Sequence, residues 1–487
     1  MKILIKDATI MTMDSKNTII DKGVIEITDD KITWVGKEPT NDKDYFNEII
    51  DGEKKLITPG LYNSHTHSPL SIAKGAMDKA FHAVIMWYIQ GWTANRSKDE
   101  IYASTRYATL EMLKTGTIGC IDQFPEQYFE SEDVDAAAQA YIDSKMKATL
   151  ALRIYDLEYS DILPVDRSVI SPDLMIRLND SLFKIRPVNE TVKICRRAIE
   201  KWHDPDGKLQ IALGPSAPLR CSKELLTQVK LISDEYQVGV HTHLLESKVQ
   251  TEISQKLYGK TLVQFLDDFG LLNEKLSCAH TIWVTDGDIR LLGDNRVSVV
   301  HNIASNLKGS NGISPIRRLL DAGCNISLGT DGCESNGSLN LFSLTKLATV
   351  VHRINEPNMS KWLSSEDIMR MMTVGGAKTS LNHNSGSLEI GQKADLVIYD
   401  LNSPWLTPCN NPQDQLVYSE NGSSVETVII DGEVVVEKGR ILCMNEELVK
   451  EEARELAMQM QTRNKHMFKV AEKLIPILQK EHILRFK

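Results

Sequence analysis

Residues 56–70 read LITPGLYNSHTHSPL, an apolar run that is broken by Pro-Gly and followed by two histidines one residue apart. Side chains i and i+2 of an extended strand point to the same face. His65 and His67 are therefore expected to lie side by side. Two neighbouring imidazoles either pack together by coincidence or form half of a metal site, and the rest of the 487-residue chain has to supply the other half.

Seven more apolar stretches follow, and helical periodicity fills most of the gaps, for example over 98–115, 223–236 and 313–322. The stretches read TIGCIDQF, KATLALRIYD, LQIALGPSAP, VGVHTHLLES, LSCAHTIW, VSVVHNIA and CNISLGTDG. Strands that alternate with helices are expected to be parallel. Eight of them over about 275 residues predict a closed (β/α)8 TIM barrel.

The two ends of the chain have a different texture. Residues 1–57 and 386–441 contain short alternating strands with Gly and Asp turns, including the hairpin signal Asp431-Gly432. We predict that these two pieces form one small β-sandwich, interrupted by a barrel at 58–385. Residues 442–487 have amphipathic helical spacing and predict a helical extension that either covers the barrel or contacts another subunit.

Composition narrows the class of protein. The formal net charge of −10 argues against a nucleic-acid partner and against an anionic membrane surface. No apolar run is long enough for a membrane span, and the first residues lack the apolar core of a signal peptide. The eight cysteines are scattered without a C-x-x-C pair, which indicates reduced thiols and a cytoplasmic protein.

Polar residues with metal-ligand chemistry end five of the predicted strands, which is where TIM barrels carry their chemistry. These residues are His65 and His67, His241 and His243, His280, His301, and Asp331. A single strand-end histidine is more often structural, but four strand ends aimed at one cavity favour a metal site. Imidazoles with one carboxylate suit Zn²⁺, or Fe²⁺. Such an ion lowers the pKa of a bound water toward about 7.

A water activated in this way needs groups that handle its protons. Asp331 can bind the ion and also accept a proton. Glu246 follows His243 by three residues in HTHLLES, close enough to reach over the metal. The alternative for Glu246 is an ordinary carboxylate on a surface loop.

Six segments, taken in order, resemble the amidohydrolase superfamily over residues 1–441. They read PGLYNSHTH, HTHLLES, CAHTIWVTDGDIRLL, HNIASNLKGSNGISPIRRLLDAG, LGTDGCESNGSLNLF and GSLEIGQKADLVIYDL. The closest resemblance is to the branch of aromatic deaminases and triazine hydrolases, which includes methylthioadenosine/adenosylhomocysteine deaminases, guanine-type deaminases and chlorotriazine hydrolases.

The resemblance implies one divalent metal, zinc or iron, held by His65, His67, His243 and Asp331. It also implies that Glu246 shuttles a proton and that His280 orients the attacking hydroxide. No lysine ends the fourth strand, so the binuclear form with a carbamylated lysine is not expected.

The sequence departs from the branch in GPSAP, where Ser216 stands in the place of a histidine found in many nucleoside-deaminating members. This argues against an adenosine-type ring, and LYGKTLVQFL, HRINEPNMSKWLS and DQFPEQ look closer to triazine hydrolases. Glu246 and Asp331 are both retained, however. Their presence favours displacement of an amine, which must be protonated to leave, over displacement of chloride, which need not be.

Several residues are candidates for contact with the substrate. Trp87 follows the first strand and could stack on a flat ring, with core or lid packing as an equal alternative. The other candidates lie at or just beyond strand ends, where a structural role is equally open: Gln123, Arg153, Ser216, His301 and Asn306.

The sequence thus predicts a metal-dependent aminohydrolase that replaces an amino group on a purine, pterin, pyrimidine or triazine by water. One alternative is a triazine-type chlorohydrolase or a hydrolase of a guanidine C–N bond in a biosynthetic pathway. Another is an inactive barrel that acts as a binding protein. The expected partners are a small heterocyclic substrate and further copies of the chain, in a homodimer or a larger homo-oligomer.

Overall fold

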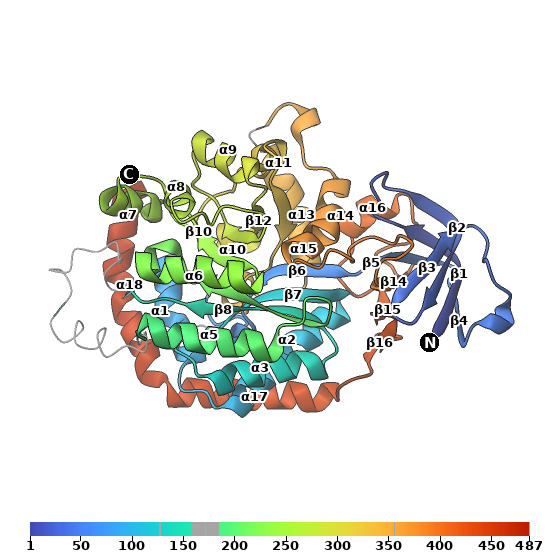
Figure 1. Ribbon diagram of the computed structural model, residues 1–487, viewed down its shortest axis with the longest axis horizontal. Helices are drawn as coiled ribbons and strands as arrows, with labels where there is room; N and C mark the ends of the chain where they lie inside the picture. The colour runs from blue at the N-terminus through green and yellow to red at the C-terminus, as the bar shows by residue number, and fades with distance from the viewer. Residues whose placement is uncertain (126–127, 158–170, 172–184, 355, 487) are drawn as a thin grey trace.

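The computed structural model describes residues 1–125, 128–157, 171, 185–354 and 356–486, with side chains up to Lys480. Figure 1 shows a large lobe of strands and helices, with a smaller β lobe that carries the N-terminus at one end. The colours of the small lobe come from both ends of the bar, so the two ends of the chain meet there.

The large lobe is built on eight parallel strands that pair in chain order. They are β6 (Leu61–Thr66), β7 (Thr117–Phe124), β8 (Lys147–Ile154), β9 (Leu209–Pro215), β10 (Val240–Leu244), β11 (Leu276–His280), β12 (Ser298–His301) and β13 (Asn325–Leu328). The segment after β13 returns to β6, where Asn63 Nδ2 donates to Thr330 Oγ1 at 2.7 Å. The predicted (β/α)8 barrel is confirmed.

Helices connect the barrel strands, and most of them bury apolar side chains against the rest of the fold. They are α1 (His82–Thr93), α2 (Lys98–Lys114), α3 (Ser131–Asp143), α5 (Val188–Trp202), α6 (Lys223–Tyr236), α7 (Lys248–Tyr258), α8 (Leu262–Asp267), α9 (Asp286–Asp294), α10 (Ile303–Lys308), α11 (Ile316–Asp321), α12 (Cys333–Asn336), α13 (Phe342–Val350), α14 (Ser365–Met372) and α15 (Val374–Thr379). The helix predicted over 313–322 is shorter than expected, because Pro315 precedes its first turn.

The small lobe contains nine strands drawn from both ends of the chain. They are β1 (Lys2–Met11), β2 (Ile19–Thr28), β3 (Lys31–Gly36), β4 (Glu48–Asp51), β5 (Lys55–Pro59), β14 (Leu396–Asp400), β15 (Val425–Ile430), β16 (Glu433–Glu437) and β17 (Arg440–Ile441). They follow one hydrogen-bonded path, β17-β16-β15-β14-β5-β1-β2-β3, with β4 beside β1. Antiparallel β5 and β14 join the two ends, with Ile57 opposite Ile398 in the core of this lobe.

The junction between the lobes lies inside the segment that the sequence suggests as one barrel strand. The extended segment is interrupted at Gly60, so that β5 pairs in the sheet of the small lobe and β6 begins the barrel. A Cβ at Gly60 would lie 2.5 Å from Ile118, so glycine permits this close approach. Lys147 of β8 is buried and reaches across to Asp395 Oδ2 at 2.5 Å and Asp431 Oδ1 at 2.8 Å.

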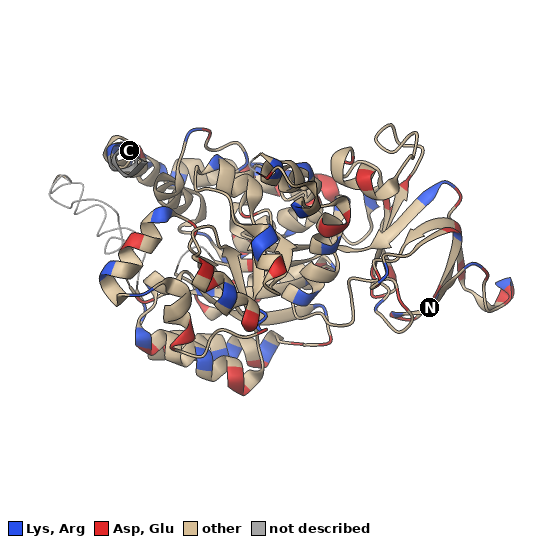
Figure 2. Ribbon diagram, turned by 90° about the horizontal axis from the view of Figure 1, so that it is seen from above, with Lys and Arg blue, Asp and Glu red and all other residues tan. Residues whose placement is uncertain are grey.

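The C-terminal segment forms α17 (Glu446–Arg463) and α18 (Lys465–Phe486), while α16 (Pro412–Tyr418) lies between β14 and β15. Helix α18 packs against α1, and their side chains share an apolar cluster that includes Trp87, Trp92 and Leu478. Figure 2 shows acidic and basic residues interspersed on the outer helices. Among the helices of the described residues, none has the length and apolarity that a membrane crossing requires.

Candidate active site

Buried polar side chains converge where the barrel strands end. His65 lies in β6, His67 directly follows this strand, and Asp331 follows β13. The Nε2 atoms of the two histidines lie 3.5 and 3.2 Å from Asp331 Oδ1. Candidate ligand atoms of His65, His67 and Asp331 all lie within 4.8 Å of one another, and the same holds for His65, His243 and His280.

The outer ring nitrogens of two of these histidines face backbone carbonyls. His67 Nδ1 lies 3.0 Å from the carbonyl oxygen of Gln123, and His243 Nδ1 lies 2.7 Å from that of Ser216. A carbonyl only accepts hydrogen bonds, so each Nδ1 carries the hydrogen. With the hydrogen on Nδ1, each Nε2 carries the lone pair, which is the arrangement in which histidine ligates a metal.

His65 and His280 are oriented in the same way by side chains. His65 Nδ1 lies 2.8 Å from Nε2 of His241, whose own Nδ1 lies 2.7 Å from Ser277 Oγ. His280 Nδ1 donates to Asn306 Oδ1 at 2.8 Å. In the described part of the chain, the buried Nε2 atoms of His65 and His280 have no hydrogen-bond partner.

Orphaned imidazole nitrogens beside a carboxylate fit a divalent cation of the zinc or iron type. Burial lowers the pKa of His65 to about 4 and that of His243 well below its usual value, which keeps these two imidazoles neutral. Burial acts in the same direction on His67, but the neighbouring Asp331 outweighs it and raises the pKa of His67. Burial acts in the opposite direction on Asp331, but the neighbouring His65 and His67 bring the pKa of this carboxyl well below its usual range. Neutral imidazoles and an ionised carboxylate are the ligand forms of these groups.

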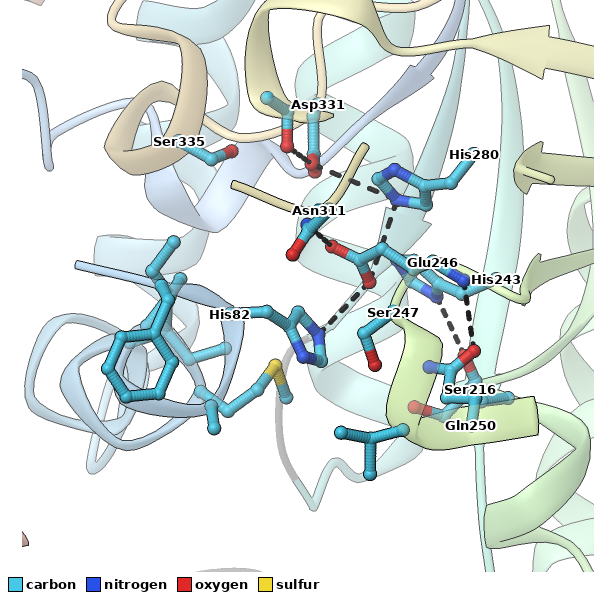
Figure 3. A pocket seen from close by; sticks show the side chains of 18 of the residues that line it. His82, Ser216, His243, Glu246, Ser247, Gln250, His280, Asn311, Asp331 and Ser335 are labelled. Atoms are coloured by element: carbon cyan, nitrogen blue, oxygen red, sulfur yellow. Dashed lines mark hydrogen bonds and ion pairs between the residues drawn. The ribbon is translucent and has the colours of Figure 1, made fainter. Parts of the chain in front are cut away.

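Glu246 is held from both sides in the pocket shown in Figure 3. Its Oε1 accepts a hydrogen bond from Asn311 Nδ2 at 2.9 Å, and its Oε2 lies 3.0 Å from His82 Nε2. His280 Nε2 lies 3.9 Å both from Glu246 Oε2 and from Asp331 Oδ2. Against the effect of burial, His280 and His82 lower the pKa of Glu246 to about 2. Glu246 is therefore an ionised carboxylate aimed at the space beside the candidate ligands.

The pocket around Glu246 has one apolar side and one polar side. The apolar side is formed by Leu70, Phe81, Ile85, Met86, Ile89 and Leu478. Leu478 lies in α18, so the C-terminal extension contributes to the pocket wall. The polar side includes Arg153 and Ser216, whose side chains are joined by a 3.0 Å hydrogen bond from Nε to Oγ. These two are expected substrate contacts that the structure places at the pocket.

The other four expected substrate contacts are not among the described residues that line this pocket. Gln123 Nε2 donates to the carbonyl of His241 at 3.2 Å, and Asn306 orients His280. The buried His301 lies 3.2 Å from His352, Nε2 to Nε2. Trp87 lies in the apolar cluster that α1 shares with α18, rather than in the pocket where it was expected to stack on a substrate ring. Gln123 and Asn306 thus lie behind the candidate ligands, where they orient neighbouring histidines rather than contact a substrate.

The sequence does not indicate His82, Asn311 or Glu334, which the structure brings to the pocket. His82 opens α1, Asn311 lies in a loop, and Glu334 lies in α12. None of the three ends a strand. The only sequence signal is that Glu334 follows Asp331 by three residues.

Comparisons with known proteins agree with this geometry. The model of the amidohydrolase family matches residues 56–435. The 5'-deoxyadenosine deaminase of Methanosarcina acetivorans is 34% identical over 463 residues, which are 95% of this chain and 99% of that protein. The 5-methylthioadenosine/S-adenosylhomocysteine deaminase of Thermococcus sibiricus is 34% identical over 439 residues, which are 90% of this chain and 94% of that protein.

Among solved structures, atrazine chlorohydrolase TrzN from Arthrobacter aurescens TC1, crystallised with zinc, is similar with a TM-score of 0.84 and 28% identity. The match covers 93% of this chain and 100% of that one. The two deaminases confirm the prediction of a hydrolase that acts on C–N bonds and deaminates a nitrogen heterocycle. They do not support the expectation, drawn from Ser216, of a ring unlike adenosine. On the match over residues 56–435 and these two relatives, the chain belongs to the amidohydrolase family.

Proposed function

We propose that this enzyme hydrolyses the exocyclic C–N bond of an adenosine-like nucleoside and releases ammonia. One observation carries the proposal: Glu246 and Asp331 both flank His280, each with a carboxylate oxygen 3.9 Å from its Nε2, directly beside the candidate ligands. Two carboxylates are what the removal of an amine needs, because one accepts a proton from water while the other delivers one. The names of the two deaminase relatives support the class of substrate.

We propose zinc as the metal, held by His65, His67, His243 and Asp331. This set offers three imidazoles and one carboxylate, all of which are ligand types for zinc, and a similar structure was crystallised with zinc. When bound, zinc lowers the pKa of a water toward about 7 and so supplies the nucleophile at neutral pH.

Side chains of the protein carry out the proton transfers and hold the reacting groups in place. Asp331 Oδ2, which accepts a hydrogen bond from Ser305 Oγ at 2.5 Å, is the base for the proton of the attacking water. Glu246, which is ionised at rest, first takes one proton from the water and then passes it to the ring nitrogen next to the reacting carbon; the proton that Asp331 accepts goes to the departing amine. Asn311 and His82 fix the Glu246 carboxylate in place. His280, locked by Asn306, orients the water between the two carboxylates.

The test is turnover of 5'-deoxyadenosine by the purified, zinc-loaded protein. Ammonia release and the ultraviolet change from an adenine to a hypoxanthine ring should appear together, with Glu246→Gln as the inactive control. A chlorotriazine assayed in parallel for chloride release tests the triazine-type alternative, which the similarity to atrazine chlorohydrolase supports. Turnover of the triazine without turnover of the nucleoside contradicts the proposal.

Cellular location and assembly are also proposed here. The eight cysteines are all free, six of them buried, which supports a reducing and hence cytoplasmic setting. Exposed Leu448 and Met458 on α17 offer apolar contacts for a homodimer or a larger homo-oligomer. Sedimentation of the purified protein measures the assembly, and a monomer at micromolar concentration contradicts it.

A further inference from the structure

Glu334 is a buried carboxylate that has no role in the reaction proposed above. It lies in α12, three residues beyond Asp331, and lines the same pocket with 4% of its surface exposed. Its Oε2 has no hydrogen-bond partner within the ranges that the structure describes. A buried acceptor without a donor costs free energy, so such groups are normally satisfied by the protein, by water or by a ligand.

The position of this carboxylate is set by its neighbours at the reacting end of the pocket. A Cβ at Gly332 would lie 2.1 Å from Glu334 Oε2, so the carboxylate folds back over a glycine that directly follows Asp331. Burial and the carboxylate of Asp331 together raise the pKa of Glu334, and His67 acts in the opposite direction. Glu334 thus belongs to the lining of the same pocket as the candidate ligands Asp331 and His67.

We propose that Glu334 accepts a hydrogen bond from the amino group that departs, and that it thereby selects amine over chloride or alkoxide leaving groups. The inference rests on the proposed function. An amino group offers an N–H donor to Oε2. A chlorine or a methoxy oxygen at the same place offers only lone pairs, so the buried acceptor stays unsatisfied. Sites built around a buried polar group discriminate strongly against an analogue that lacks its partner.

The leaving groups also differ in what they require. In deamination the oxygen of water bonds to the ring carbon and the C–N bond breaks. The two protons of the water end on the ring nitrogen and on the departing ammonia. Chloride leaves with the bonding electron pair and needs no proton, so its departure does not depend on orienting an N–H group. Loss of Glu334 should thus slow departure of the amine selectively.

The test compares three substrates that share one sugar: 5'-deoxyadenosine and its analogues with chlorine or methoxy in place of the amino group. Values of kcat/KM are measured for the zinc-loaded wild type, Glu334→Gln and Glu334→Ala. Glu366→Gln, which removes an exposed carboxylate in α14, controls for loss of charge. Zinc content and melting temperature check that each variant is folded and loaded.

Glu334→Ala should lose about ten- to a hundredfold in kcat/KM for the amine, and Glu334→Gln, which keeps a carbonyl acceptor, should lose less, with little change for the chloro and methoxy analogues in either variant. The ratio between substrates is a readout that simple damage to the fold would not move. An equal loss on all three substrates, or an unchanged ratio, overturns the inference. If the wild type turns over none of the three, the proposed function itself is wrong and the inference falls with it.

Discussion

The backbone N–H of Asp331 donates a hydrogen bond to the carbonyl oxygen of His65, with 2.9 Å between nitrogen and oxygen. The bond joins the segment after the last barrel strand to the first strand. Asp331 has a φ of +64°, an uncommon conformation for a residue other than glycine and one that is often found at functional sites. The same hydrogen bond therefore closes the barrel and brings the candidate metal ligands His65 and Asp331 together.

The proton-handling roles predict that Asp331→Asn and Glu246→Gln fold normally but lose turnover. Each substitution keeps the size of the side chain and removes the group that accepts or delivers a proton. We expect kcat to fall at least about a thousandfold in each variant, measured by ammonia release. Melting temperature serves as the control for folding. Wild-type kcat in either variant would refute its role.

Removal of the metal should abolish activity and lower stability. A ligand that binds only the folded state stabilises it, so a chelator should lower the melting temperature together with activity. Addition of one equivalent of zinc should restore both. Full activity of protein shown by elemental analysis to be metal-free would contradict the account.

The contact between His82 and Glu246 predicts a shift in pH dependence. His82 is one of the groups that lower the pKa of Glu246, although burial opposes it. His82→Leu removes this influence and raises the pKa of Glu246, so the acid limb of kcat/KM should move to higher pH. His82→Gln can still donate to Glu246 but lacks the charge, so the limb should move while kcat is better preserved. A pH profile identical to that of the wild type in both variants would show that His82 plays no such part.

The buried contact between the two lobes predicts a large effect on stability. Lys147→Met leaves the buried carboxylate of Asp395 without its cation, and leaves Asp431 with only Lys393 at 3.8 Å. We expect the free energy of unfolding in urea to fall by about 3–5 kcal/mol. Lys145→Met is the matched control, because Lys145 pairs with Glu433 at the surface and should change stability by about 0–1 kcal/mol. Equal effects of the two substitutions would contradict the special role of the buried contact.

The barrel could be predicted because its strands are short apolar runs whose last residues are polar. TIGCIDQF and LQIALGPSAP contain β7 and β9, and the ends of β6, β10, β11 and β13 lead into the residues that form the site. The split at Gly60 could not be predicted, since one continuous apolar pattern serves two sheets. The boundary between the two strands is set by the close packing of Gly60 against Ile118, a contact that the sequence does not show.

The remaining site residues depend on tertiary contacts that carry no local pattern. His82 reaches Glu246 because α1 lies over the strand ends, and α1 is placed there partly by α18, which comes nearly four hundred residues later. Trp87 belongs to the same helix, and spacing alone could not show that its ring faces α18 rather than the pocket. Gln123 and Asn306 lie at or just beyond strand ends as predicted, but Gln123 Nε2 donates to the carbonyl of His241 and Asn306 Oδ1 accepts from His280.

Anomalous scattering from crystals of the zinc-loaded protein at the zinc absorption edge locates the metal and so tests the proposed ligand set. We expect one ion per chain, about 2.0–2.2 Å from the Nε2 atoms of His65, His67 and His243 and from a carboxylate oxygen of Asp331. A zinc-loaded crystal with no ion among these four side chains, or with its zinc bound elsewhere, would contradict it.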